Sequence, residues 1–122
     1  MARILVVDDS AVSQLILTHI LLEAEHEVIP AANGREAHAL LAAQDADLLI
    51  SDIYMPEMDG IELLTQLRSE ERFSRLPVIL LTGSADDERL LQQQFDVNEP
   101  MLKKPVSSWE LLALAEQLLE SS

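Results

Sequence analysis

Four apolar runs in this sequence are each followed by side chains that can act in phosphate chemistry. The side chains are Asp8 and Asp9 after the first run, then Asp52, Thr82 and Lys104 after three later ones. Short continuous apolar runs are typical of strands buried on both faces of a parallel sheet. Since the carboxyl ends of such strands lie on one edge of the sheet, we predict that these five side chains converge there.

Three carboxylates in one crevice repel one another, so their charge requires a compensating cation. The chain contains no cysteine, and no histidine stands at these strand ends, so the available ligands are oxygens. Hard oxygen ligands favour Mg²⁺ or Mn²⁺, and Mg²⁺ typically takes one or two carboxylates together with waters and phosphate oxygens. A carboxylate beside Mg²⁺, an ammonium and a hydroxyl can accept a phosphoryl group, with the carboxylate as the nucleophile.

Each of these residues also has an interpretation without chemistry. Asp8 or Asp9 would cap the first helix, and Asp52 alone would be a solvated residue at the entry to a loop. Thr82 suits a strand because it is β-branched, and Lys104 would be a solvated surface residue. Their joint occurrence at the predicted strand ends favours a site.

The elements that must position these residues alternate between strand and helix. We predict strands at 3–7, 27–31, 48–52, 77–82 and 101–102. We also predict five helices. The first runs from Ser10 to about Ala24, the second from Asn33 to Ala43, the third from Asp59 to beyond Leu67, the fourth from a cap within Ser84–Asp87 through Phe95, and the fifth from Ser107 to beyond Leu118. The helices starting near Asn33, Asp59 and Ser107 each have a capping residue followed three positions later by Glu. Five strand–helix units predict an α/β fold, a doubly wound parallel sheet with helices on both faces.

Composition limits the possible functions. A chain of 122 residues is expected to form one domain, 1–122, and its formal charge of −14 argues against binding nucleic acid or an anionic membrane. No segment resembles a signal peptide or has transmembrane length, so we expect a cytoplasmic protein. Neither a Gly-x-Gly-x-x-Gly nor a P-loop motif is present, which argues against a dinucleotide site or a P-loop nucleotide site.

The sequence resembles the receiver domains of response regulators, of the chemotaxis-regulator type, over its whole length. The resemblance rests on four motifs taken together: Val-Val-Asp-Asp-Ser at 6–10, Asp52-x-x-Met-Pro-x-Met-Asp-Gly at 52–60, Leu-Thr-Gly at 81–83, and Lys-Pro at 104–105. It implies a flavodoxin-like sheet of strand order 2-1-3-4-5. It also implies two-component signalling, with no turnover of a foreign substrate.

The resemblance further implies a role for each site residue. Asp52 is the expected phosphoacceptor, taking a phosphoryl group from a histidine of a sensor kinase or phosphotransfer protein. Asp9, Asp52 and the main-chain carbonyl of Tyr54 are the expected direct ligands of Mg²⁺, and Asp8 acts through water. Lys104 pairs with the phosphoryl group and Thr82 hydrogen-bonds it. The Lys104–Pro105 peptide bond is expected to be cis.

The sequence departs from the family pattern in three places. Met101 occupies the position on the last strand where an aromatic switch residue is usual. The segment 96–100 replaces the small residues that usually precede that strand. Tyr54 and Ser84 stand where the family tunes the lifetime of the phosphoryl group, and the sequence does not determine in which direction.

Two apolar surfaces are candidates for partner binding. Leu17 and Leu21 on the first helix would dock the phosphodonor, although we favour the alternative that they pack against the core. Trp109, Leu112 and Leu119 would form a surface on the last helix for output or self-association, and packing at the helix start is the alternative for Trp109.

Two other functions remain open. A phosphorylation-independent interaction module would explain Met101 and the segment 96–100, but it would not need the acidic residues. A small Mg²⁺-dependent phosphohydrolase would require a second acid two residues after Asp52, where Tyr54 stands. The start of the first strand at residue 3 favours an N-terminal or stand-alone receiver, with an unknown downstream effector domain or protein.

Overall fold

The computed structural model describes residues 1–55, 57–83, 89, 91–93 and 99–121, which form a three-layer α/β fold. Five parallel strands make one sheet in the order β2-β1-β3-β4-β5. The strands are β1 (Arg3–Val7), β2 (Glu27–Ala31), β3 (Leu48–Asp52), β4 (Val78–Thr82) and β5 (Met101–Lys103). The predicted fold class and strand order are therefore confirmed.

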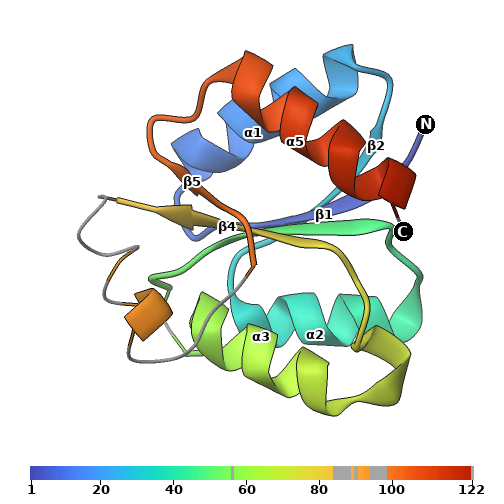
Figure 1. The fold of residues 1–122 in the computed structure, drawn as a ribbon, viewed down its shortest axis with the longest axis vertical. Coiled ribbons are helices and arrows are strands. Elements are labelled where there is room, and N and C mark those ends of the chain that lie inside the picture. Colours follow the sequence, from blue (N-terminus) through green and yellow to red (C-terminus); the bar gives the residue numbers. More distant parts are fainter. Residues whose placement is uncertain (56, 84–88, 90, 94–98, 122) are drawn as a thin grey trace.

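Helices cover both faces of the sheet. Helices α1 and α5 lie on one side, and α2 and α3 lie on the other (Figure 1). Their bounds are α1 (Ala11–Glu23), α2 (Gly34–Ala43), α3 (Gly60–Ser69) and α5 (Ser108–Ser121), with a short 3₁₀ helix η1 (Glu71–Phe73) after α3. The helix that we predict from Ser84–Asp87 through Phe95 falls largely outside the described residues.

Capping hydrogen bonds explain where four helices begin. The side-chain oxygens of Ser10 and Asn33 accept hydrogen bonds from backbone N–H groups of α1 and α2. At α3, Asp59 and Glu62 form a complete capping box, which satisfies two otherwise unpaired N–H groups. At α5, the Ser107 hydroxyl accepts from the Glu110 N–H at 3.4 Å.

Alternating side chains of the strands build two cores. In β1, Leu5 and Val7 belong to the core beneath α2 and α3, whereas Ile4 and Val6 belong to the core beneath α1 and α5. Both faces of the central strands are thus buried, which is why they appear in the sequence as unbroken apolar runs. Met101 is half-buried and packs against the core beneath α2 and α3.

Helix α1 buries the two leucines that we considered as a docking surface and expected, in preference, to pack against the core. Leu17 and Leu21 are only 2% and 0% exposed and pack in the core, so the alternative interpretation of these two residues is correct. The exposed apolar side chains of this helix are instead Val12, Leu15, Ile16 and Leu22. Because apolar residues occur on all sides of α1, periodicity does not show which side faces the sheet.

The last helix also differs in detail from the predicted surface. Trp109 is 77% exposed, so it does not pack at the helix start, whereas Leu112 and Leu119 are half-buried.

In the described part of the chain, none of the helices has both the length and the apolar character needed to cross a bilayer.

Candidate functional site

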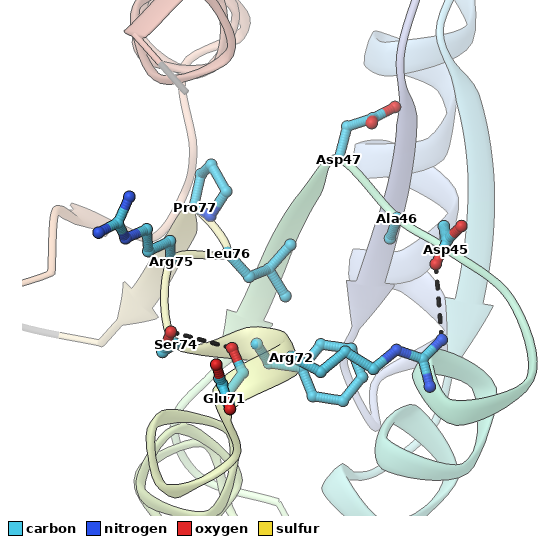
Figure 2. Close-up of a pocket in the computed structure, with 10 residues that line it drawn as sticks. Asp45, Ala46, Asp47, Glu71, Arg72, Ser74, Arg75, Leu76 and Pro77 are labelled. Atoms are coloured by element: carbon cyan, nitrogen blue, oxygen red, sulfur yellow. Dashed lines mark hydrogen bonds and ion pairs between the residues drawn. The ribbon is translucent and has the colours of Figure 1, made fainter.

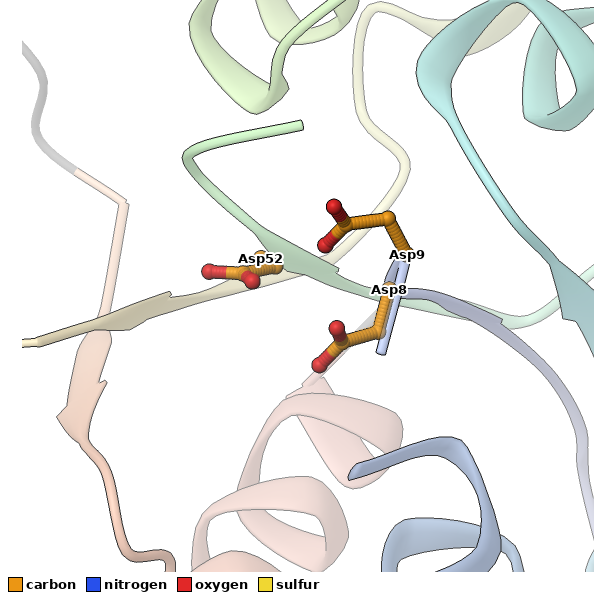
Figure 3. Close-up of side chains that lie close together, drawn as sticks. All are labelled: Asp8, Asp9 and Asp52. Carbon is orange, nitrogen blue, oxygen red and sulfur yellow. The ribbon is translucent and has the colours of Figure 1, made fainter. Parts of the chain in front are cut away.

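Three carboxylates meet at the carboxyl edge of the sheet. Asp8 and Asp9 follow β1, and Asp52 ends the neighbouring strand β3. Because Val7 pairs with Ser51 across the two strands, the residues that follow each of them lie at the same level of the sheet. One carboxylate oxygen from each residue lies within 4.8 Å of the others, and Figure 3 shows the three side chains gathered at this edge. The sequence prediction that these acids converge is therefore confirmed.

Lys104 reaches the same acids from the end of β5. Its Nζ donates to Asp8 Oδ2 at 2.8 Å and to Asp52 Oδ2 at 3.1 Å. The peptide bond between Lys104 and Pro105 is cis, as expected. The lysine is thus a partner of two acids in the site and not a solvated surface residue.

The backbone fixes the remaining oxygens of two of the acids. The Ile53 N–H donates to Asp52 Oδ1 at 2.8 Å, and the Ser10 N–H donates to Asp8 Oδ1 at 2.9 Å. Asp8 is 1% exposed, so its orientation is set entirely by protein contacts. Asp9 is exposed, which leaves its carboxylate open to solvent.

Burial and charge set the protonation of the central pair. Burial raises the pKa of the Asp52 carboxyl above its ordinary value, the Lys104 ammonium offsets this only in part, and the charge of Asp8 adds to the rise. Burial lowers the pKa of Lys104, but its hydrogen bonds with Asp8 and Asp52 outweigh that effect and raise the pKa overall. A single ammonium therefore undercompensates the carboxylates around it.

Thr82 and Tyr54 lie next to this cluster. Thr82 ends β4, and Asp52 pairs with Leu81 in the adjoining strand, so Thr82 is one residue beyond the level of Asp52. Its side chain is fully buried, and its hydroxyl has no hydrogen-bond partner within the described residues. The Tyr54 side chain is 57% exposed, and the role of its carbonyl stays a prediction. Ser84 lies outside the described residues.

Close packing holds the loop after Asp52 in place. The Gly60 N–H donates to the Ile53 carbonyl at 2.8 Å, and a Cβ at Gly60 would lie 2.4 Å from the Asp52 carbonyl oxygen. Only glycine allows α3 to begin this close to the end of β3. The Asp-Gly pair thus caps the helix and also determines how closely α3 approaches Asp52.

Sequence reasoning missed two residues that support the site. The Gln14 amide Nε2 donates to the carbonyls of Val6 at 2.9 Å, Asp8 at 3.3 Å and Ala31 at 2.6 Å, which ties together the ends of β1 and β2. Ser13 accepts a bond from Lys104 Nζ at 3.3 Å. Both residues lie in the first turn of α1, a few residues after the Asp8–Asp9 pair. Their closeness in the sequence to these two acids was the feature that could have identified them as site residues.

A separate hollow lies at the other end of the sheet. It has a volume of 580 Å³ and is lined by residues 45–47, which precede β3, and by residues 71–77, which precede β4. Figure 2 shows Arg72 directed toward Asp45 across it, and these two side chains form an ion pair at 3.5 Å. None of the predicted site residues lines this hollow.

Comparisons with known proteins agree with this geometry. Residues 4–116 match the family model described as "Response regulator receiver domain". Protein PilH of Pseudomonas aeruginosa is 33% identical over 119 residues, covering 98% of both chains. Hybrid signal transduction histidine kinase D of Dictyostelium discoideum is 34% identical over 95% of this chain, which spans 7% of that protein.

A solved structure has the same fold at similar identity. The signal receiver domain of a signal transduction histidine kinase from Syntrophus aciditrophicus superposes with a TM-score of 0.91 at 34% identity, covering 99% of this chain and 92% of that one. The family match spans nearly the whole chain, and the solved receiver domain shares its fold. The protein therefore belongs to the response regulator receiver domain family of two-component signalling systems.

Proposed function

We propose that Asp52 is the phosphoacceptor of this receiver domain and takes a phosphoryl group from a phosphohistidine of a sensor kinase or phosphotransfer protein. The observation that carries the proposal is the contact of Lys104 with both Asp52 and Asp8, at 3.1 and 2.8 Å. Three strands far apart in the sequence contribute to this contact, which suits a site built to handle a concentrated negative charge.

Asp52, Lys104 and Thr82 have different roles in the proposed phosphoryl transfer. A carboxylate oxygen of Asp52 forms a bond to phosphorus while the phosphorus–nitrogen bond of the donor breaks, and the leaving imidazole nitrogen keeps that electron pair. Lys104 donates hydrogen bonds to the phosphoryl oxygens and offsets their charge. The Thr82 hydroxyl, which has no partner among the described residues, supplies a further donor.

The acids suit a divalent cation. Asp8, Asp9 and Asp52 carry three negative charges against the single positive charge of Lys104, so a charge of −2 remains to be compensated. Their oxygens are the ligands that Mg²⁺ prefers. We propose that Asp9, Asp52 and the Tyr54 carbonyl bind Mg²⁺ directly and that Asp8 acts through water. When bound, Mg²⁺ neutralises charge on the phosphoryl oxygens.

The phosphodonor is proposed to dock over α1, on exposed residues other than Leu17 and Leu21, which pack in the core. Val12, Leu15 and Ile16 are 68%, 72% and 52% exposed, and they lie within two turns of Asp9. An apolar surface this close to the acidic cluster would position a donor histidine near Asp52. A cytoplasmic location, a single domain over 1–122 and the absence of foreign-substrate turnover remain parts of the proposal.

Mass spectrometry of the intact protein tests the proposal. After incubation with Mg²⁺ and acetyl phosphate, the parent should gain the mass of one phosphoryl group, and the Asp52→Asn variant should not. An unchanged mass in the parent, under conditions where Mg²⁺ binding is demonstrated, would favour the interaction module that works without phosphorylation. Modification of both proteins would place the acceptor at another residue.

A further inference from the structure

The third partner of the Lys104 ammonium is a neutral hydroxyl. An ammonium has three N–H donors and no acceptor. The three oxygens around Nζ are Asp8 Oδ2 at 2.8 Å, Asp52 Oδ2 at 3.1 Å and Ser13 Oγ at 3.3 Å. We propose that Ser13 is a positioning residue that holds Lys104 in the site during phosphoryl transfer. This inference rests on the proposed function.

Ser13 differs from the other two partners in what happens to it during the reaction. Asp8 and Asp52 belong to the acidic cluster, and Asp52 ceases to be a free carboxylate when it carries a phosphoryl group. Ser13 is uncharged and lies outside that cluster, in the first turn of α1. Its N–H donates to the capping hydroxyl of Ser10 at 3.3 Å, which anchors this turn. Ser13 is therefore a partner whose charge does not change as the reaction proceeds.

Lys104 needs such a restraint because open space lies beside it. A hollow of 380 Å³ between α1 and the loop after β5 is lined by Ser13, Ile16, Leu17, Lys104, Pro105 and Val106. The Lys104 side chain is 27% exposed, so packing alone does not confine its flexible stem. When the bond to Asp52 is exchanged for one to the phosphoryl group, the ammonium has room to turn away. The bond to Ser13 opposes that movement.

The test compares Ser13→Ala and Ser13→Thr with the parent, and Ser69→Ala on α3 serves as the control. Phosphorylation by acetyl phosphate with saturating Mg²⁺ is followed at increasing donor concentration. We expect Ser13→Ala to lower the maximal rate about 3- to 10-fold, as loss of one long hydrogen bond to a charged group would. The half-saturating donor concentration should stay within about twofold, and Ser13→Thr should restore most of the rate.

A second readout does not depend on activity. The ¹⁵N-ammonium signal of Lys104 in NMR spectra should broaden or disappear in Ser13→Ala and persist in Ser13→Thr and Ser69→Ala. Parent-like rates and signals in Ser13→Ala would overturn the positioning role while leaving Asp52 as acceptor. Equal loss in the Ala and Thr variants would also overturn it, because the hydroxyl would not be the cause. A parent that takes no phosphoryl group would instead refute the proposed function, and the inference with it.

Discussion

Replacing Lys104 by methionine should destabilise the metal-free protein. The ammonium lies 2.8 Å from Asp8 and 3.1 Å from Asp52, whose side chains are 0% and 15% exposed. Methionine keeps much of the apolar stem but removes the charge, so two buried carboxylates lose their cation. The carboxylates cannot turn into solvent, because backbone N–H groups hold their other oxygens.

The size of the effect follows from the burial of the partners. Removing one partner of a fully buried ion pair costs about 3–5 kcal/mol. Lys104 is 27% exposed, so solvent screens part of the interaction, and we expect a loss of about 2–3 kcal/mol. For a domain with a urea m-value of about 1–3 kcal/mol/M, the unfolding midpoint should fall by about 0.7–3 M.

Mg²⁺ should restore most of the free energy of unfolding that Lys104→Met loses. A divalent cation and an ammonium roughly 4 Å apart repel each other by about 2 kcal/mol even at the dielectric constant of water. Without the ammonium, we expect Mg²⁺ to bind roughly tenfold more tightly or better. Saturating Mg²⁺ should therefore stabilise Lys104→Met more than it stabilises the parent.

Urea unfolding in EDTA and in saturating Mg²⁺ measures both effects. The control is Lys103→Met, which makes the same change at the exposed neighbouring residue and should shift the midpoint little. A Lys104→Met variant as stable as the parent in EDTA would refute the reasoning about buried carboxylates. A stability difference that Mg²⁺ does not narrow would show that the cation does not act on these acids.

Three further predictions concern Thr82, Asp52 and Gly60. Thr82→Val should raise the free energy of unfolding by about 1 kcal/mol, because it removes a buried hydroxyl that has no hydrogen-bond partner among the described residues, and should slow phosphorylation by acetyl phosphate; lower stability in urea would contradict this. The raised pKa of Asp52 gives a stability contribution that is full below pH 3.8 and is lost as pH rises through the folded pKa. The gain in stability of Asp52→Asn over the parent in EDTA should therefore grow as the pH rises above 3.8, and a gain independent of pH would count against burial as the cause. Gly60→Ala places a Cβ 2.4 Å from the Asp52 carbonyl and should lower the free energy of unfolding by about 1–3 kcal/mol in thermal melts, whereas a parent-like melt would show that α3 can shift.

Local sequence patterns predicted most of the strands and helix caps around the site. The strands ending at Val7 and Asp52 are buried on both faces, so each appears as an unbroken apolar run that stops where the sheet meets solvent. Capping residues are equally local, since Asp59 and Glu62 satisfy N–H groups within their own helix turn. Parallel pairing then places the strand ends on one edge, which is why Asp8, Asp9, Asp52 and Lys104 were predicted together.

The orientation of α1 was not predictable in the same way. Val12, Leu15 and Ile16 are as apolar as Leu17 and Leu21, yet the first three are exposed and the last two are buried. The side that faces the sheet depends on where the loop after Asp9 delivers the helix, and that is a tertiary property. Of the two interpretations given for Leu17 and Leu21, the favoured one, packing against the core, is confirmed, and docking at these two residues is excluded by their burial.

The sequence by itself determined the strand–helix order, the caps and the edge at which the acids lie, because these depend on contacts close in the chain or on pairing rules. Tertiary structure alone decided which oxygens surround the Lys104 ammonium. Its partners are 91 residues away at Ser13, 96 away at Asp8 and 52 away at Asp52. Contacts over such separations depend on angles and distances between packed elements, which no local pattern encodes.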